Sequence, residues 1–322
     1  MIIQSRCPVK RHSVLYMRQK KTDREGMLKT EMVSHKMVRA ISADGSVIAC
    51  AVDSTEIVGE IEKIHVISAV VTAALGRLAT AASMIGSMLK GEDDTVTLRM
   101  NGGGPSGSLI AVADSRGNVK AYVANPVVEL PLNQYGKLDV SGAVGKDGYL
   151  SVIKDVGLDE PSTGTVEIVS GEIAEDITNY FAVSEQTPTV CGLGVLVNPD
   201  LTVKGAGGYL VQLLPFADES CIDRLEANLK EMPAVSKMYA DGMTAEEVCM
   251  RLLDGLEPNV LDCFDPAYKC DCSIERVSRA LVSLGKDELM KMAEEQDCTE
   301  VNCHFCNKKY TFTADDLKNL IR

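Results

Sequence analysis

The sequence contains no tryptophan and only five phenylalanines in 322 residues. A core must therefore be built from valine, isoleucine, leucine, alanine and methionine, and the hydrophobic fraction of 45% provides enough of them. A chain of this length can form one large domain and one small one.

Long uncharged apolar runs are also missing. The most apolar stretch, from Ile64 to Leu89, is interrupted by His65, Arg77 and several glycines and serines. We therefore expect a helix packed inside a domain and no membrane span. Nor do the first residues contain the apolar segment of a secretory signal. We expect a cytoplasmic protein, whose eleven cysteines are reduced, metal-bound or redox-active.

Positive charge is scarce as well, because the net charge is −13. Nucleic-acid backbones are bound by lysine and arginine, so we expect no nucleic-acid partner. Residues 1–26 are the exception: seven basic residues against Asp23 and Glu25 give a net charge of +5. We expect residues 1–34 to be a disordered basic extension.

Alternating apolar and polar residues predict an α+β core over residues 35–215, with antiparallel sheets and packed helices. Two strands are expected within 38–58 around the turn Asp44-Gly45, followed by a helix over 64–90. Further strands are expected at 95–100, 108–114, 119–125, 148–154, 164–169, 190–198 and 207–215, and a further helix at 173–181.

Two glycine-rich segments are candidates for a nucleotide site. NGGGPSG at 101–107 lacks the lysine of a phosphate loop, and GAGG at 205–208 precedes a strand instead of following one. We expect tight turns at both places.

Residues 216–262 differ in character from the core. They show helical periodicity, many acidic residues and the helix breakers Pro233, Gly242 and Pro258. We expect a metastable helical linker, not a second core, followed by a small domain over 263–322.

This last segment holds two close cysteine pairs, Cys270–Cys272 and Cys303–Cys306, with thirty residues between them. Two chelating pairs of soft ligands are what zinc needs. The intervening residues predict a helix from Ile274 that is capped by Ser273 and ends at Gly285, then a second short helix. So small a segment lacks a sufficient core, and zinc binding can supply roughly 10–16 kcal/mol of folding free energy.

Several alternatives remain for these thiols. They could be independent buried cysteines, which two pairs at chelating spacing disfavour, or ligands of a purely structural zinc ribbon in an adaptor protein. A zinc enzyme would need an open coordination position, which four cysteine ligands do not leave. Cys263, Cys298 and His304 could substitute as ligands, but none forms a close pair of its own. Cys7, Cys50, Cys191, Cys221 and Cys249 are interpreted as ordinary residues.

The same four thiols could act as a redox switch. Zinc holds cysteines as thiolates, the form that oxidants attack. A disulfide between Cys303 and Cys306 closes a ring of ordinary size, whereas Cys270 and Cys272 would need a bent backbone.

The chain resembles the heat shock protein 33 family of redox-regulated chaperones over residues 35–322. The residues that carry the resemblance are YFAVSEQTPT at 180–189, AGGYLVQLLP at 206–215 and the pattern CDCS, LGKDEL, VNCHFC and YTF between 270 and 312. Three features depart from the family: Ile274 replaces an arginine, Cys263 and Cys298 are additional, and the basic extension has no counterpart.

The resemblance implies an ATP-independent holdase without enzymatic activity. It implies that Cys270, Cys272, Cys303 and Cys306 bind one Zn²⁺ per chain in an inactive reduced form. Oxidation would form the disulfides Cys270–Cys272 and Cys303–Cys306, release zinc and open the linker. The active form would bind unfolding client proteins, as an oxidised homodimer.

Overall fold

The structure is a computed structural model that describes residues 20–22, 28–30, 35–215 and 217–320. Strands β1 (Lys20–Thr22) and β2 (Leu28–Thr30) pair with each other in a separate unit. The other residues of the expected basic extension lie outside the described part of the chain, so its disorder stays a prediction. Residues 35–322 form the second unit.

The first large sheet is fully antiparallel, in the order β10-β11-β4-β3-β12. Its strands are β3 (Met37–Ile41), β4 (Val47–Asp53), β10 (Thr189–Val197), β11 (Val203–Leu213) and β12 (Asn259–Phe264). The predicted turn joins β3 to β4, with Gly45 at φ +74° and the Asp44 carboxylate accepting a hydrogen bond from the Ser46 amide. The hairpin is confirmed.

The expectation of a strand reaching Val58 is wrong, because β4 ends at Asp53. The helix expected over 64–90 is present with shorter bounds. Helix α1 (Thr55–His65) begins directly after β4 and buries Ile57, Val58 and Ile61, which follow helical spacing. It ends where Val66 adopts φ +50°, and helix α2 (Ala69–Gly86) follows.

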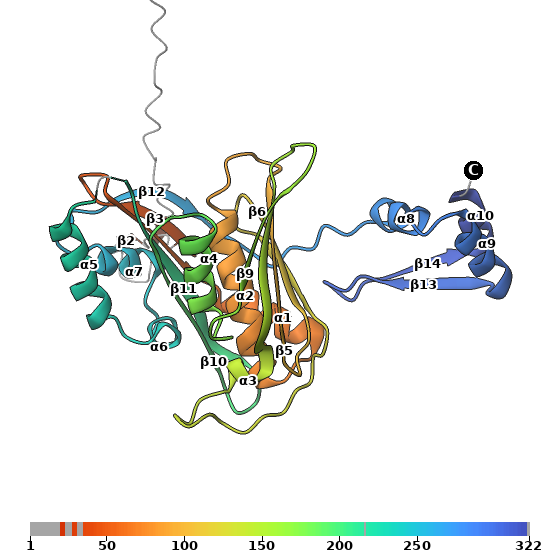
Figure 1. The fold of residues 1–322 in the computed structure, drawn as a ribbon, viewed down its shortest axis with the longest axis horizontal. Coiled ribbons are helices and arrows are strands. Elements are labelled where there is room, and N and C mark those ends of the chain that lie inside the picture. The colour runs from red at the N-terminus through yellow and green to blue at the C-terminus, as the bar shows by residue number, and fades with distance from the viewer. Residues whose placement is uncertain (1–19, 23–27, 31–34, 216, 321–322) are drawn as a thin grey trace, which may run out of the picture. The chain divides into compact units, whose positions relative to one another are not determined.

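Helix α2 is the core of the domain and lies between the two large sheets (Figure 1). By length and composition alone it could cross a membrane, but 89% of it is buried inside the protein, as expected for a core helix. Its small residues allow this position: a Cβ on Gly76 would lie 2.7 Å from Val58 Cγ1.

The second large sheet is also antiparallel, in the order β7-β6-β5-β8-β9. Its strands are β5 (Thr95–Gly103), β6 (Leu109–Asp114), β7 (Val119–Val123), β8 (Gly145–Asp155) and β9 (Ser162–Glu167). Val96, Leu98 and Met100 of β5 alternate into the core, so the predicted meander is confirmed. Helices α3 (Val140–Val144) and α4 (Ala174–Val183) complete this part, and α4 is the helix expected at 173–181.

The two glycine-rich segments have different structures. NGGGPSG forms the end of β5 and the turn to β6, as expected. GAGG is not a turn, because residues 205–208 lie inside β11. The reason is close packing: a Cβ on Gly207 would lie 2.2 Å from the ring of Tyr239, and one on Gly205 would lie 2.6 Å from the amide of Ala240.

The linker (residues 216–262) contains helices α5 (Glu219–Glu231), α6 (Val235–Ala240) and α7 (Ala245–Leu252), as its periodicity predicts. These helices cover the face of the first sheet opposite α2 (Figure 1). They bury an apolar cluster of their own, to which the sheet contributes Val38, Ala49 and Val211, and the linker Val248 and Leu252. The expectation that no second core forms here is wrong. Strand β12 spans the expected boundary at 262, so the domain limits stay a prediction.

The C-terminal module contains helices α8 (Ile274–Val282), α9 (Lys286–Glu295) and α10 (Ala314–Leu320) and the hairpin of β13 (Cys298–Asn302) with β14 (Lys309–Thr313). Ser273 caps α8 by accepting from the Arg276 amide, and Gly285 at φ +94° separates α8 from α9, both as predicted. Its small core contains Leu281, Leu289, Tyr310, Phe312 and Leu317. The expected α+β fold class is confirmed.

Candidate metal centre

The four paired cysteines meet at one point of the C-terminal module. Cys270 and Cys272 lie in the extended segment before α8, and Cys303 and Cys306 lie in the turn between β13 and β14. That turn is closed by the amide of Cys303, which donates to the Lys308 carbonyl at 2.9 Å. All four Sγ atoms lie within 4.8 Å of one another, so the group could hold a metal ion.

The sulfur geometry fits a tetrahedral zinc site. Ligands 2.3 Å from zinc would have sulfurs about 3.8 Å apart. Sγ of Cys270 lies 3.6 Å from Sγ of Cys303, and Sγ of Cys272 lies 3.4 Å from Sγ of Cys306. Both of these separations join one pair to the other across the site, while all four sulfurs lie within 4.8 Å of one another. Proximity alone therefore does not select the expected disulfides.

The surroundings of the thiols are unequal. Burial raises the pKa of Cys270. Burial also acts to raise the pKa of Cys272, but hydrogen bonds from the Tyr310 hydroxyl and the neighbouring thiols outweigh it and lower this pKa to about 7. The protein thus stabilises the thiolate of Cys272.

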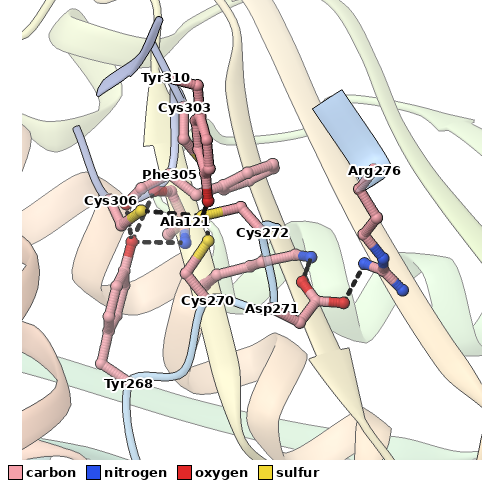
Figure 2. Close-up of polar contacts among 11 residues, drawn as sticks. Ala121, Tyr268, Cys270, Asp271, Cys272, Arg276, Cys303, Phe305, Cys306 and Tyr310 are labelled. Atoms are coloured by element: carbon pink, nitrogen blue, oxygen red, sulfur yellow. Dashed lines mark hydrogen bonds and ion pairs between the residues drawn. The ribbon is translucent and has the colours of Figure 1, made fainter. Parts of the chain in front are cut away.

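Asp271 lies between two of the cysteines and forms an ion pair with Arg276 of α8 (Figure 2). It forms a second ion pair with Lys120 of β7. Lys120 also lies 5.2 Å from the ring centroid of Phe305, in the second cysteine turn. A single lysine of the core therefore contacts both cysteine segments, and its positive charge lies beside a group that would be dianionic with zinc bound.

Other contacts hold the cysteine turn against the core. The side-chain amide of Asn307 donates to the Ile64 carbonyl at 2.6 Å, and the His304 ring packs edge-on against Tyr122 with centroids 4.9 Å apart. His65 hydrogen-bonds the Ala121 carbonyl at 3.0 Å, and burial lowers its pKa.

The alternative ligands lie outside the group. Cys263 is in β12 opposite Val38, Cys298 is exposed at the start of β13, and His304 contacts Tyr122 instead of the sulfurs. Cys50, Cys221 and Cys249 are buried and Cys191 is half-buried in the core, while Cys7 lies outside the described residues.

Sequence reasoning missed Tyr310, Tyr268 and Lys120. The two tyrosines lie within four residues of a cysteine in a chain poor in aromatics, which is a usable signal. Lys120 is distant in sequence, and nothing in the chain links it to the site.

Comparison with known proteins identifies the family to which the chain is similar. The model of the Hsp33 family, described as Hsp33 protein, matches residues 35–313. The 33 kDa chaperonin of Clostridium botulinum strain Alaska E43 is 46% identical over 290 residues, covering 90% of this chain and 98% of its own. That of Bacillus licheniformis is 48% identical over 284 residues, covering 88% and 98%. A crystal structure of the Thermotoga maritima 33 kDa chaperonin gives a TM-score of 0.79 at 38% identity, covering 89% and 98%.

Fold, site and relatives together define a chaperone of mixed α+β architecture with a four-cysteine centre. The chain belongs to the Hsp33 family. Its relatives are named as chaperonins, and their names describe no catalytic reaction.

Proposed function

We propose that this chain is a redox-regulated, ATP-independent holdase, inactive while Cys270, Cys272, Cys303 and Cys306 together hold one zinc ion. The observation that carries the proposal is the gathering of these four sulfurs within 4.8 Å from two segments thirty residues apart. Bound zinc would keep the sulfurs as thiolates and stabilise a module whose own core is small.

Activation is oxidation of these thiols. In the expected pairs Cys270–Cys272 and Cys303–Cys306, two thiols and one hydrogen peroxide give one disulfide and two waters. Sulfur is oxidised and peroxide is reduced. Disulfide sulfurs are no longer thiolate ligands, so the site loses its capacity to hold the metal and the module loses stability.

The linker is the element that would then open. It covers an apolar face of the first sheet that includes Val38, Ala49 and Val211, and its own helices are short. Separation of linker and sheet would expose both apolar surfaces to unfolding client proteins. We propose that the active form is an oxidised homodimer that acts in the cytoplasm and needs neither nucleic acid nor membrane.

The test measures metal release and client protection in one experiment. Reduced, zinc-loaded protein is treated with peroxide at moderately raised temperature, zinc is followed with a chromogenic chelator, and light scattering follows a denaturing client protein. We expect about one zinc per chain to be released and scattering to be suppressed only after release. An adaptor with a structural zinc ribbon would keep its metal and leave scattering unchanged, which would refute the proposal.

A further inference from the structure

Strand β7 is the terminal strand of the second sheet, and a short stretch of the chain covers its outer edge. We call residues 267–269 the strap. The amide of Val119 donates to the Ala267 carbonyl at 3.0 Å, and the amide of Lys269 donates to the Val119 carbonyl at 2.9 Å. The strap is therefore added to the sheet as a parallel strand, with Tyr268 bridged to Val119.

The C-terminal module holds the strap in place. The strap leads directly into Cys270, and the Tyr268 hydroxyl lies within hydrogen-bond reach of the Phe305 carbonyl in the other cysteine turn. Next along the chain, Asp271 pairs with Lys120 of β7. Loss of the folded module would remove the contact with Phe305. The strap would then be retained by its two backbone hydrogen bonds to Val119, by the Ala267 amide bonded to the Asn118 side chain at 3.2 Å, and by the contacts of Tyr268 with the core.

Departure of the strap would uncover hydrogen-bonding groups. The amide and carbonyl of Val119 point outward to the strap, and the Ala121 carbonyl accepts from the Tyr268 hydroxyl at 3.3 Å. An uncovered strand edge of this kind pairs readily with another extended chain.

We propose that the edge of β7, once the strap has left it, binds an extended segment of an unfolding protein as an added strand. This inference rests on the proposed release of the metal. It assigns a client-binding surface on the second sheet, apart from the linker and the first sheet.

The contacts of the strap indicate the chemistry of the segment that would replace it. Lys120 engages a carboxylate and an aromatic ring, and Tyr268 lies against the strand edge, three residues before that carboxylate at Asp271. The preferred segment is therefore extended, with an aromatic residue followed three positions later by an acidic one. Backbone hydrogen bonds would give affinity, and these two side chains would give preference.

The test uses a defined probe on the full-length protein. The probe is a fluorescein-labelled peptide with the sequence of residues 264–273 carrying Cys270→Ser and Cys272→Ser. Its anisotropy is measured with reduced zinc-loaded protein and with reduced protein stripped of zinc by a chelator. We expect at least tenfold tighter binding to stripped protein, because the strap covers the edge while the module is folded.

Two controls isolate the edge. A peptide N-methylated at the position of Lys269 lacks the donor to Val119 and should bind about fivefold or more weakly. The full-length K120Q variant should bind the unmodified peptide several-fold more weakly. Equal binding of both peptides, or no effect of K120Q, overturns the proposed recognition.

Failure of this inference is distinguishable from failure of the proposed function. Stripped protein that suppresses client aggregation but leaves the peptide unbound refutes the β7 edge and leaves the holdase standing. Peptide binding that is equal in loaded and stripped protein refutes the role of the strap as a cover.

Discussion

The hydroxyl of Tyr310 donates a hydrogen bond of 3.1 Å to Sγ of Cys272, from within the small core of the C-terminal module. A donor of this kind stabilises a thiolate and fixes the direction of its lone pairs, as outer partners of metal ligands commonly do.

Replacing this hydroxyl should therefore weaken metal binding without unfolding the module. We expect Y310F to lower zinc affinity by about 10- to 100-fold, the usual effect of losing such a partner. Competition with a chelator measures it. The exposed Tyr135 provides the control, and Y135F should bind zinc as the unchanged protein does. Unchanged zinc affinity in Y310F would show that the hydrogen bond contributes nothing to the metal site.

The ligand set gives a second prediction. Changing Cys270, Cys272, Cys303 or Cys306 singly to serine should lower bound zinc well below one per chain, because each change removes one of four soft donors. C263S and C298S are the matched controls and should keep about one zinc per chain, measured by metal analysis of purified protein. The assignment is wrong if C298S loses the metal while C272S retains it.

The order of oxidation is a third prediction. Cys303 and Cys306 lie in a hairpin turn that can close a disulfide, whereas Cys270 and Cys272 lie in an extended segment in which i and i+2 are near the upper Cα separation of about 6.8 Å. Asp271 between them is also fixed by Lys120. We expect peroxide in the cold to yield the Cys303–Cys306 disulfide first, and warming to yield the second. Thiol-trapping mass spectrometry over time decides, and early closure of Cys270–Cys272 would contradict this order.

A fourth prediction concerns the linker. Leu252, the last residue of α7, is fully buried in the cluster between the linker and the first sheet, so L252A should destabilise this packing by about 2–5 kcal/mol. We expect faster hydrogen exchange in residues 219–252 and partial client protection without oxidation. L289A, in the core of the C-terminal module, is the control, since it should reduce metal retention before it affects the linker. Equal exchange of the linker in reduced and oxidised unchanged protein would remove the linker from the mechanism.

The fifth prediction is a pH dependence at Glu185, in the loop after α4. Burial acts to raise the pKa of this carboxyl, but hydrogen bonds from Lys154, at 2.7 Å, and from Tyr180 outweigh it and lower the pKa below 4.5. The unfolded state therefore binds a proton first as pH falls. The stabilisation is complete above pH 4.5 and is lost as the pH falls through the folded-state pKa.

E185Q should consequently lower the melting temperature at neutral pH and flatten its decline on acidification. Thermal unfolding measured between about pH 3 and pH 7 tests this window. E129Q, at an exposed loop position, should follow the unchanged protein. A parallel shift of E185Q at every pH would contradict the assigned role.

The gathering of the four cysteines could be predicted from the sequence, because it depends on local features of the chain. Two short cysteine spacings and a capping serine before a periodic helix define the module without knowledge of the rest of the fold. The contacts of Lys120 and Tyr268 could not be predicted, since they depend on how the module packs against β7, and no local pattern encodes that packing.

The errors in the core have a common physical origin. Thr55–Val58 has apolar residues compatible with strand or helix, and only the burial of Ile61 one turn later separates the two. In 205–208 the glycines suggested a turn, but they serve the close approach of α6 to β11. The linker appeared too polar for a core, because seven of the seventeen buried residues in its apolar cluster are supplied by the sheet.

The place of β12 has a consequence for reversibility. Strands β11 and β12 belong to the same sheet, so residues 214–258 form a loop of 45 residues tied down at both ends. Helices released from the sheet would remain tethered beside it. While β12 stays paired, the ends of the loop are held together, so rebinding of the helices would lose no further loop-closure entropy. The linker helices would then reassociate with the sheet in a unimolecular step that does not depend on protein concentration. The rate of return to the resting state would be set by client dissociation.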